Sequence, residues 1–250
     1  MFERMGGTMK ASLADQRSIL DIQNFDLKAA TLRNKADHLP EITQINSLTI
    51  KQNNARDLRI AAETELSDVK RELSRAESDV EQVLTRITRD ETRLTSNTAS
   101  PKELEQLQHE IGTLGARRSE LEEVELEIMM RVDVIKDRIT ELSSEESELA
   151  LEIANLEIRK ENALTVIHTD LDEIKEERQR TSETIDKALL DLYEKICSSN
   201  NATGAAALVG NQCKGCNLTL NTIELQRIAG LPDDEVVRCE ECRCILVRGL

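Results

Sequence analysis

Aromatic residues are almost absent from this chain, which contains no Trp, one Tyr and two Phe among its 250 residues. A globular core of this size normally uses aromatic side chains, so most of the chain is not expected to form one. Charged residues instead make up 32% of the sequence, alongside many Leu, Ile and Ala residues. This combination predicts long helices that are exposed to solvent.

Other missing features narrow the class of protein further. No stretch approaches 18 consecutive apolar residues, so no membrane-spanning helix is expected. The first ten residues lack the apolar region of a secretory signal, which together with free thiols predicts the cytoplasm. No Gly-rich phosphate loop, nucleophile motif or pair of catalytic carboxylates is found. We therefore expect no enzymatic activity.

Basic residues are too few for an electrostatic binder of nucleic acid. The net charge is −15, and its distribution is uneven. Residues 10–196 carry 27 Lys and Arg against 41 Asp and Glu, whereas residues 197–250 carry 5 against 6. Such a chain would release few counterions from a phosphate backbone.

Two long runs of apolar residues dominate the middle of the chain. After a predicted first helix over residues 11–38, Pro40 interrupts the pattern because proline lacks the N–H that a helix interior needs. Apolar residues then recur at alternating three- and four-residue steps from Ile45 to Leu94 and again from Leu104 to Leu192. The second run slips by one residue around 160–164. This spacing is typical of coiled coils.

A short loop near residues 95–101 separates the two runs. Ser100, Pro101 and Glu103 restart the helix as N-cap, first helical residue and capping glutamate. The short connection predicts an antiparallel hairpin within one chain, and this monomeric hairpin is favoured over a parallel dimer of straight helices. In such a hairpin Pro40 lies opposite about residue 158, close to the slip.

Several charged residues interrupt the apolar seam, among them Arg59, Arg118, Glu125 and Glu146. Charges at seam positions usually fix the register or the choice of partner at a cost in stability. They would also suit a site at which the helix of another protein docks. The sequence is consistent with both roles.

The strongest motif lies near the C-terminus, where two Cys-x-x-Cys pairs stand 22 residues apart. The four predicted metal ligands are Cys213, Cys216, Cys239 and Cys242. Two disulfides are the alternative, but the rest of the chain does not look secreted, which favours one Zn²⁺ ion. Because four thiolates leave no open position for water or substrate, the zinc is expected to be structural.

Two further cysteines are set apart from these pairs. Cys244 could compete with Cys242, although it departs from the usual two-residue spacing. Cys197 is far from both pairs and is interpreted as a thiol near a helix end. Asn217, directly after the first pair, tolerates the left-handed backbone of a metal knuckle. His38, His109 and His168 lie on different helical segments, and no spacing gathers them into a site.

The predicted fold is mainly α, with a long antiparallel coiled-coil helical hairpin followed by a small C-terminal zinc ribbon. Its predicted parts are a disordered segment over residues 1–10, the hairpin over 11–196, a small polar linker over 197–207 and the ribbon over 208–250. Within the ribbon, short apolar runs suit two hairpins that meet at the metal, and Asn221 to Gly230 reads as a short helix.

Residues 11–250 resemble one bacterial family of coiled-coil proteins with a C4-type zinc ribbon, often described as predicted nucleic-acid-binding. The matching stretches are residues 20–26 (LDIQNFD), residues 100–110 (SPKELEQLQHE), the first Cys-x-x-Cys pair and residues 237–247 around the second pair. The resemblance implies no known catalytic activity and an adaptor or regulatory role, because some relatives are linked to transcription factors and to flagellar or secretion assembly. One difference is Arg243, followed by Cys244, where the family usually has Gly.

Two functions remain open. The first is an adaptor, in which the rod presents the ribbon to a protein partner. The second is a regulator that binds DNA or RNA through the ribbon. The balance of charge favours the adaptor. Nucleic-acid contacts would have to come from five basic residues of the ribbon, if folding gathers them on one face: Lys214, Arg227, Arg238, Arg243 and Arg248.

Overall fold

The computed structural model describes residues 9–96, 100–200 and 203–249. The chain divides into two compact units. We call Glu41–Ile158 the hairpin unit, and Met1–Pro40 together with Arg159–Leu250 the base unit. The division falls at the two positions, Pro40 and about residue 158, that the predicted pairing places opposite each other. Among the described helices, none combines the length and the apolar composition needed to cross a bilayer.

The first two helices are separated where the sequence predicts a break. Helix α1 (Leu13–Asp37) begins after Ser12, whose side chain accepts a hydrogen bond from the Asp15 N–H. It ends at Asp37 with His38 as C-cap, and α2 (Pro40–Thr95) starts directly at the proline. Proline is tolerated there because the first residues of a helix have no intrahelical acceptor for their N–H groups.

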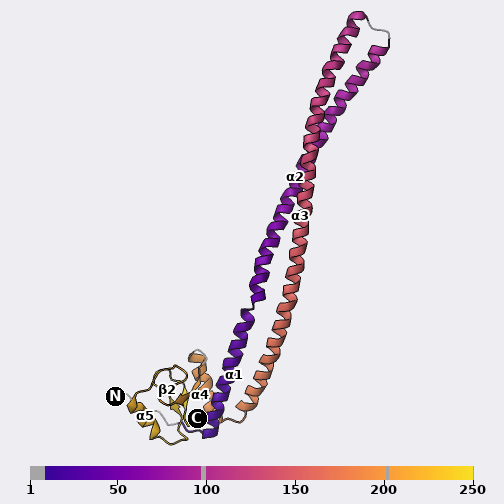
Figure 1. Cartoon of the computed structure of the whole chain (residues 1–250). Helices are drawn as coiled ribbons and strands as arrows, with labels where there is room; N and C mark the ends of the chain where they lie inside the picture. Colours follow the sequence, from indigo (N-terminus) through magenta and orange to yellow (C-terminus); the bar gives the residue numbers. More distant parts are fainter. Residues whose placement is uncertain (1–8, 97–99, 201–202, 250) are drawn as a thin grey trace. The chain divides into compact units, whose positions relative to one another are not determined.

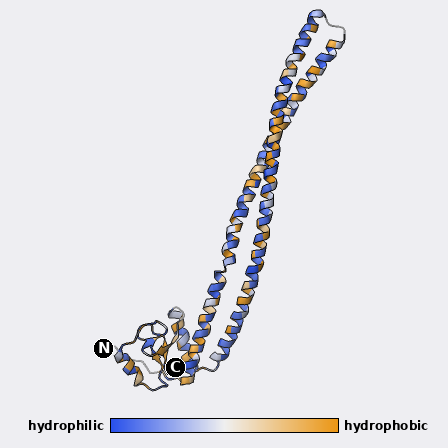
Figure 2. Cartoon of the chain, in the orientation of Figure 1, coloured by the Kyte–Doolittle hydropathy of each residue, from blue (hydrophilic) through white to orange (hydrophobic). Residues whose placement is uncertain are grey.

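The hairpin unit consists of α2 and the first part of α3 (Pro101–Ser182), which run antiparallel (Figure 1). The two helices share a buried apolar cluster of Ala62, Val69, Val132 and Ile135. In Figure 2 hydrophilic and hydrophobic residues alternate along both helices, as expected when only a narrow stripe of each is buried. The predicted antiparallel hairpin is confirmed.

Ion pairs between the helices fix the antiparallel order. Arg59 contacts Glu146 at 2.9 Å (Nε to Oε2), and Arg131 contacts Glu72 at 3.0 Å (Nη1 to Oε2). Arg59 and Glu146 are two of the charges that interrupt the seam, and each is the partner of the other. Their hydrogen bond is the first cause of a raised pKa for Arg59. These two seam charges therefore stabilise the register of the hairpin, which is the first of the two roles considered for them.

The predicted turn has the expected cap at the start of α3. The Ser100 N–H donates to the Glu103 carboxylate at 2.7 Å, and the Glu103 N–H donates to Ser100 Oγ at 3.4 Å. Helix α2 ends at Thr95 and α3 begins at Pro101. Part of the predicted turn, residues 97–99, lies outside the described residues.

The second coiled-coil run ends earlier than predicted. Helix α3 continues through residues 160–164 without interruption but stops at Ser182, whereas the seam was expected to continue to Leu192 and the hairpin to residue 196. The Ser182 and Thr184 hydroxyls donate to carbonyl groups of the preceding turn. Asp186 then caps a separate helix, α4 (Lys187–Ser199), by accepting hydrogen bonds from the next turn's N–H groups. The apolar residues after Ser182 therefore belong to another packing surface.

The ribbon is a four-stranded sheet with strand order β2-β1-β4-β3. The strands are β1 (Ala205–Val209), β2 (Gln212–Cys213), β3 (Val237–Arg238) and β4 (Ile245–Val247). The central pair, β1 and β4, is parallel, and the two outer pairs are antiparallel. Helix α5 (Thr222–Ala229) has Asn221 as N-cap and ends at Gly230, as predicted.

Both faces of the central strands are buried. Successive strand residues point to opposite faces, and Ile245 and Val247 join one apolar core while Leu246 joins the other. The first core combines α1, α4 and the sheet: Ile19, Ile22, Leu189, Tyr193, Ile196, Ala205, Ile245 and Val247. The predicted boundary at residue 208 is therefore wrong, because β1 begins at Ala205 and is already part of this core.

The segment before α1 is also ordered where it is described. The prediction of a disordered stretch over residues 1–10 is wrong for Lys10, which pairs with Glu235 in an antiparallel bridge. The Val236 N–H donates to the Met9 carbonyl at 2.9 Å, and the Ala11 N–H donates to the Asp234 carbonyl at 2.8 Å. Residues 1–8 lie outside the described residues.

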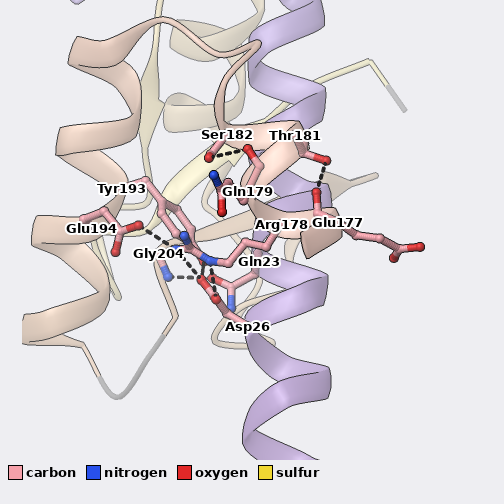
Figure 3. Close-up of polar contacts among 10 residues, drawn as sticks. All are labelled: Gln23, Asp26, Glu177, Arg178, Gln179, Thr181, Ser182, Tyr193, Glu194 and Gly204. Carbon is pink, nitrogen blue, oxygen red and sulfur yellow. Dashed lines mark hydrogen bonds and ion pairs between the residues drawn. The ribbon is translucent and has the colours of Figure 1, made fainter. Parts of the chain in front are cut away.

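A polar network around Asp26 ties α1, α3 and α4 together (Figure 3). The Asp26 carboxylate accepts two hydrogen bonds from Arg178, at 2.7 and 3.1 Å, and one from the Tyr193 hydroxyl at 2.8 Å. Arg178 also contacts Glu194 of α4. The hydrogen bonds to Asp26 are the first cause of a raised pKa for Arg178, and burial raises the pKa of Tyr193.

Gln23 connects α1 to the first strand of the sheet. Its side-chain oxygen accepts hydrogen bonds from the N–H groups of Gly204 at 2.7 Å and Ala205 at 3.0 Å. At Gly204 the chain passes so close to α4 that a Cβ atom would lie 2.5 Å from Cys197 Sγ and 2.6 Å from the Tyr193 ring. The entry of the chain into β1 thus requires a residue without a side chain.

We predict that Gly204→Ala lowers the stability of the base unit by roughly 1–3 kcal/mol, the usual cost of overpacking a core. The matched control is Gly115→Ala in α3, where a Cβ would meet no atom within 4 Å. That change should stabilise the helix by up to about 1 kcal/mol. Urea unfolding followed by circular dichroism measures both, and equal effects of the two substitutions would contradict the packing at Gly204.

Candidate metal centre

The two Cys-x-x-Cys segments form knuckles with the same backbone hydrogen bonds. In the first, the Cys213 N–H donates to the Leu218 carbonyl at 3.1 Å, and the Asn217 N–H donates to the Cys213 carbonyl at 2.8 Å. In the second, the Cys239 N–H donates to the Cys244 carbonyl and the Arg243 N–H donates to the Cys239 carbonyl, both at 2.9 Å. Two segments with no other sequence in common thus adopt one local structure.

The residue after each pair has a left-handed backbone. Asn217 has φ +60° and Arg243 has φ +61°. The interpretation of Asn217 as a knuckle residue is confirmed. Arg243 adopts the same conformation at the position where a glycine is usual in the resembled family, so the second knuckle keeps its shape with a residue that is strained there.

The sheet brings the two knuckles together. The first knuckle begins at the end of β2, which pairs with β1, and the second connects β3 to β4. Because β1 and β4 lie side by side in parallel, the two knuckles meet at the end of the sheet where both of these strands begin. Neither pair of cysteines would reach the other without this central pairing.

The sulfur atoms of Cys213, Cys216, Cys239 and Cys242 all lie within 4.8 Å of one another and could hold a metal ion. Cys213 Sγ lies 3.9 Å from Cys242 Sγ, and Cys216 Sγ lies 4.0 Å from Cys239 Sγ. A tetrahedral zinc site with Zn–S bonds of about 2.3 Å has sulfur atoms about 3.8 Å apart. The geometry and the soft donor set therefore fit a tetrathiolate site.

Burial disfavours charged sulfur in this cluster when no cation is bound. Cys213 and Cys239 are buried, and burial raises the pKa of Cys242 to about 12. A divalent cation at the centre would reverse this effect by stabilising the thiolates.

Cys244, which the sequence offered as a competitor of Cys242, lies against the cluster beside it. Its Sγ is 3.3 Å from Cys242 Sγ and 3.7 Å from Cys213 Sγ, and the residue has no solvent exposure. The four sulfurs that converge are nevertheless the predicted set, without Cys244. Cys197 lies apart, against the core of α1 and α4, and burial raises the pKa of its thiol.

Three comparisons with known proteins match this architecture. The family model for the CT398-like coiled coil hairpin domain matches residues 22–201. The chain belongs to this family. The hairpin family includes the structural relative CT398 of Chlamydia trachomatis, which is 19% identical with a TM-score of 0.68 over 94% of this chain and 98% of that one.

Mycobacterial relatives of this hairpin protein are more similar. Rv2229c of Mycobacterium tuberculosis is 33% identical over 244 residues, covering 96% of this chain and 98% of that protein. A solved structure from Mycobacterium smegmatis has a TM-score of 0.85 and 29% identity, and covers 96% of this chain and 100% of that one. The resemblance drawn from the sequence is thus confirmed at the level of family and fold.

Most of the five basic residues of the ribbon in this hairpin protein make internal side-chain contacts. Arg248 donates hydrogen bonds to five carbonyl groups, those of Ile228, Leu231, Pro232, Asp233 and Glu235. Arg227 donates two hydrogen bonds to Glu224, which lower the pKa of that carboxyl. The Arg238 side chain donates to the Arg243 carbonyl at 2.9 Å. Arg248 therefore stabilises the ribbon, and the positive charge of Arg227 is balanced by the Glu224 carboxylate.

We predict that Cys216→Ser and Cys242→Ser each abolish the binding of one metal ion per chain, because either change removes one of four converging sulfurs. Cys244→Ser and Cys197→Ser should keep the metal. Elemental analysis of the purified variants measures the metal content. Loss of metal in Cys244→Ser together with its retention in Cys242→Ser would show that the ligand set is wrong.

We predict that Arg243→Gly stabilises the metal-bound ribbon by about 1 kcal/mol, since it removes the cost of a side chain at φ +61°. Arg243→Ala is the matched control, because it removes the same long side chain but keeps a Cβ. The midpoint of urea unfolding measures the effect. An equal gain in both variants would assign it to the lost charge rather than to the backbone.

Proposed function

We propose that this chain is a non-enzymatic adaptor, a coiled-coil hairpin that carries a structural zinc ribbon and binds another protein. The proposed metal is Zn²⁺, since four cysteine sulfurs at tetrahedral spacing are the donor set of structural zinc sites. Four thiolates fill the coordination sphere, so no position is left at which a substrate could be activated. We place the protein in the cytoplasm, where its six cysteines stay reduced.

The observation that carries the protein-binding role is an exposed apolar face on α3. Leu126, Met130 and Val134 are 58%, 63% and 68% exposed and stand four residues apart, with Met129 beside them. We call these four residues the outer face. Side chains two residues apart in an α-helix are separated by about 200° around the helix axis, so they lie on opposite faces. The outer face therefore lies opposite the buried residues Val132 and Ile135 and the partly buried Ile128, which pack against α2.

The charge around the outer face indicates the kind of partner. Residues 41–158 carry 15 Lys and Arg against 27 Asp and Glu, and Glu123 and Glu127 lie on α3 next to the outer face. Apolar residues spaced by four along a helix suit the packing of a second helix, and methionine side chains adapt to its shape. A basic amphipathic helix of a partner protein would match both the apolar stripe and the carboxylates.

The alternative, a nucleic-acid-binding ribbon, has less support. Of the five candidate basic residues, Arg248 and Arg227 are held by contacts within the ribbon. The remaining three, Lys214, Arg238 and Arg243, belong to the metal knuckles or flank them. Three phosphate contacts would give weak binding that falls steeply with salt concentration.

We predict that the double variant Met130→Glu/Val134→Glu no longer retains a protein partner that co-purifies with the wild-type chain. Carboxylates there would oppose the docking of an apolar face. Leu151→Glu is the matched control, because Leu151 is 67% exposed on the same helix but outside the outer face. Affinity purification from native cell extract, with proteins identified by mass spectrometry, measures the loss.

Fluorescence anisotropy with DNA and RNA at physiological salt tests the alternative. The adaptor proposal expects no tight binding there. Submicromolar binding that resists salt and is lost in Arg238→Glu would reverse the ranking of the two functions. A partner that is retained equally by the outer-face variant and by Leu151→Glu would show that the docking site is elsewhere.

A further inference from the structure

The cluster holds one thiol more than a tetrathiolate site needs. In the second knuckle Cys244 occupies the position of Leu218 in the first, as the matching hydrogen bonds to Cys213 and Cys239 show. Leu218 is exposed, so the knuckle itself does not require a cysteine at this position. Cys244 is fully buried against two of the ligand sulfurs. Its role is therefore not explained by the metal geometry alone.

Access differs between the two neighbouring thiols. Cys242 is partly exposed, whereas Cys244 has no contact with solvent. Their sulfur atoms lie 3.3 Å apart, closer than Cys213 and Cys244 at 3.7 Å or Cys213 and Cys242 at 3.9 Å. Cys242 is thus the more accessible of two adjacent thiols, and a solvent-accessible cysteine next to a second thiol is the arrangement of a reactive cysteine with a resolving cysteine.

We propose that Cys242 and Cys244 form a peroxide-reactive dithiol site that releases the metal on oxidation. The Cys242 thiolate attacks hydrogen peroxide, which breaks the O–O bond and leaves a sulfenic acid and hydroxide. The Cys244 thiol then attacks this sulfenic sulfur and expels water. Hydrogen peroxide is reduced by two electrons, and the two cysteines are oxidised to one disulfide.

The surroundings keep both residues in place for this step. The Cys242 carbonyl accepts a hydrogen bond from the Asn200 side chain at 2.9 Å, and the Cys244 carbonyl accepts one from the Cys239 N–H. The sulfur atoms must approach from 3.3 Å to about 2.0 Å, a small shift for two rotatable side chains. Ligand pairs such as Cys216 and Cys239 lie farther apart, at 4.0 Å.

Oxidation would open the metal site, because a Cys242 sulfur in a disulfide is no longer a thiolate ligand. The three thiolates of Cys213, Cys216 and Cys239 remain as ligands. Cys213, Cys239 and Cys244 also belong to the apolar core of the ribbon. This inference rests on the metal site proposed above. Reduction by a thiol would restore the ligand and the metal-binding ribbon.

The experiment uses the full-length chain with its metal bound, treated with hydrogen peroxide in the presence of a chromogenic zinc chelator. After reduction with a thiol and re-addition of zinc, we expect wild type to bind the metal again and Cys244→Ala to recover on the order of tenfold less, because without a resolving thiol excess peroxide oxidises the Cys242 sulfenic acid further to a sulfinic acid that a thiol does not reduce. Cys244→Val is a second variant in case the smaller side chain impairs folding. Cys197→Ser, outside the cluster, should release metal at the wild-type rate.

Mass spectrometry of the wild-type protein identifies the bond directly. Trypsin cleaves after Arg238, Arg243 and Arg248, so Cys242 and Cys244 fall in separate peptides, residues 239–243 and 244–248. The expected product is this linked pair with the bond at Cys242. A linkage through other cysteines, or equal recovery of metal by wild type and Cys244→Ala after reduction, would overturn the proposal. A chain purified without metal that still forms the linked pair would refute the zinc site but not the dithiol.

Discussion

The parallel pairing of β1 with β4 is the contact on which the rest of the base unit depends. It places Ile245 and Val247 against α1 and α4 while Leu246 faces the cysteine cluster. One short strand thereby belongs to two cores. The metal knuckles at the end of this strand pair and the helices α1 and α4 on one of its faces cannot move independently, because either movement would have to break the same buried strand pair.

Polar contacts reinforce this arrangement where the apolar core is thin. Asp26 joins three helices through Arg178 and Tyr193, and Gln23 holds the chain at the entry to β1 (Figure 3). Charge-assisted hydrogen bonds of this kind are stronger than neutral ones and are directional. They fix the orientation of α4 against α1. A small apolar cluster alone would specify this orientation less strictly.

In the hairpin unit, two long helices bury only a narrow apolar stripe between them. Small residues such as Ala62 allow close approach there, and the Arg59–Glu146 pair is satisfied in one register. Near the tip, Asp90 is buried with a carboxylate oxygen that has no hydrogen-bond partner among the described residues. Such a residue costs stability. A narrow seam leaves apolar residues on the opposite side of α3 exposed.

Much of the fold and of the candidate site follows from local patterns. Heptad spacing predicts the helices, Pro40 and the Ser100 cap place their boundaries, and two Cys-x-x-Cys pairs identify the four converging sulfurs, because each signal acts within a few residues. The end of α3 at Ser182, the inclusion of β1 in the helical core and the place of Cys244 depend on the sheet. Apolar residues at heptad spacing after Ser182 pack equally well on a sheet as on a helix. Only the tertiary structure decides which surface they cover, and it alone brings a fifth thiol against the predicted ligands.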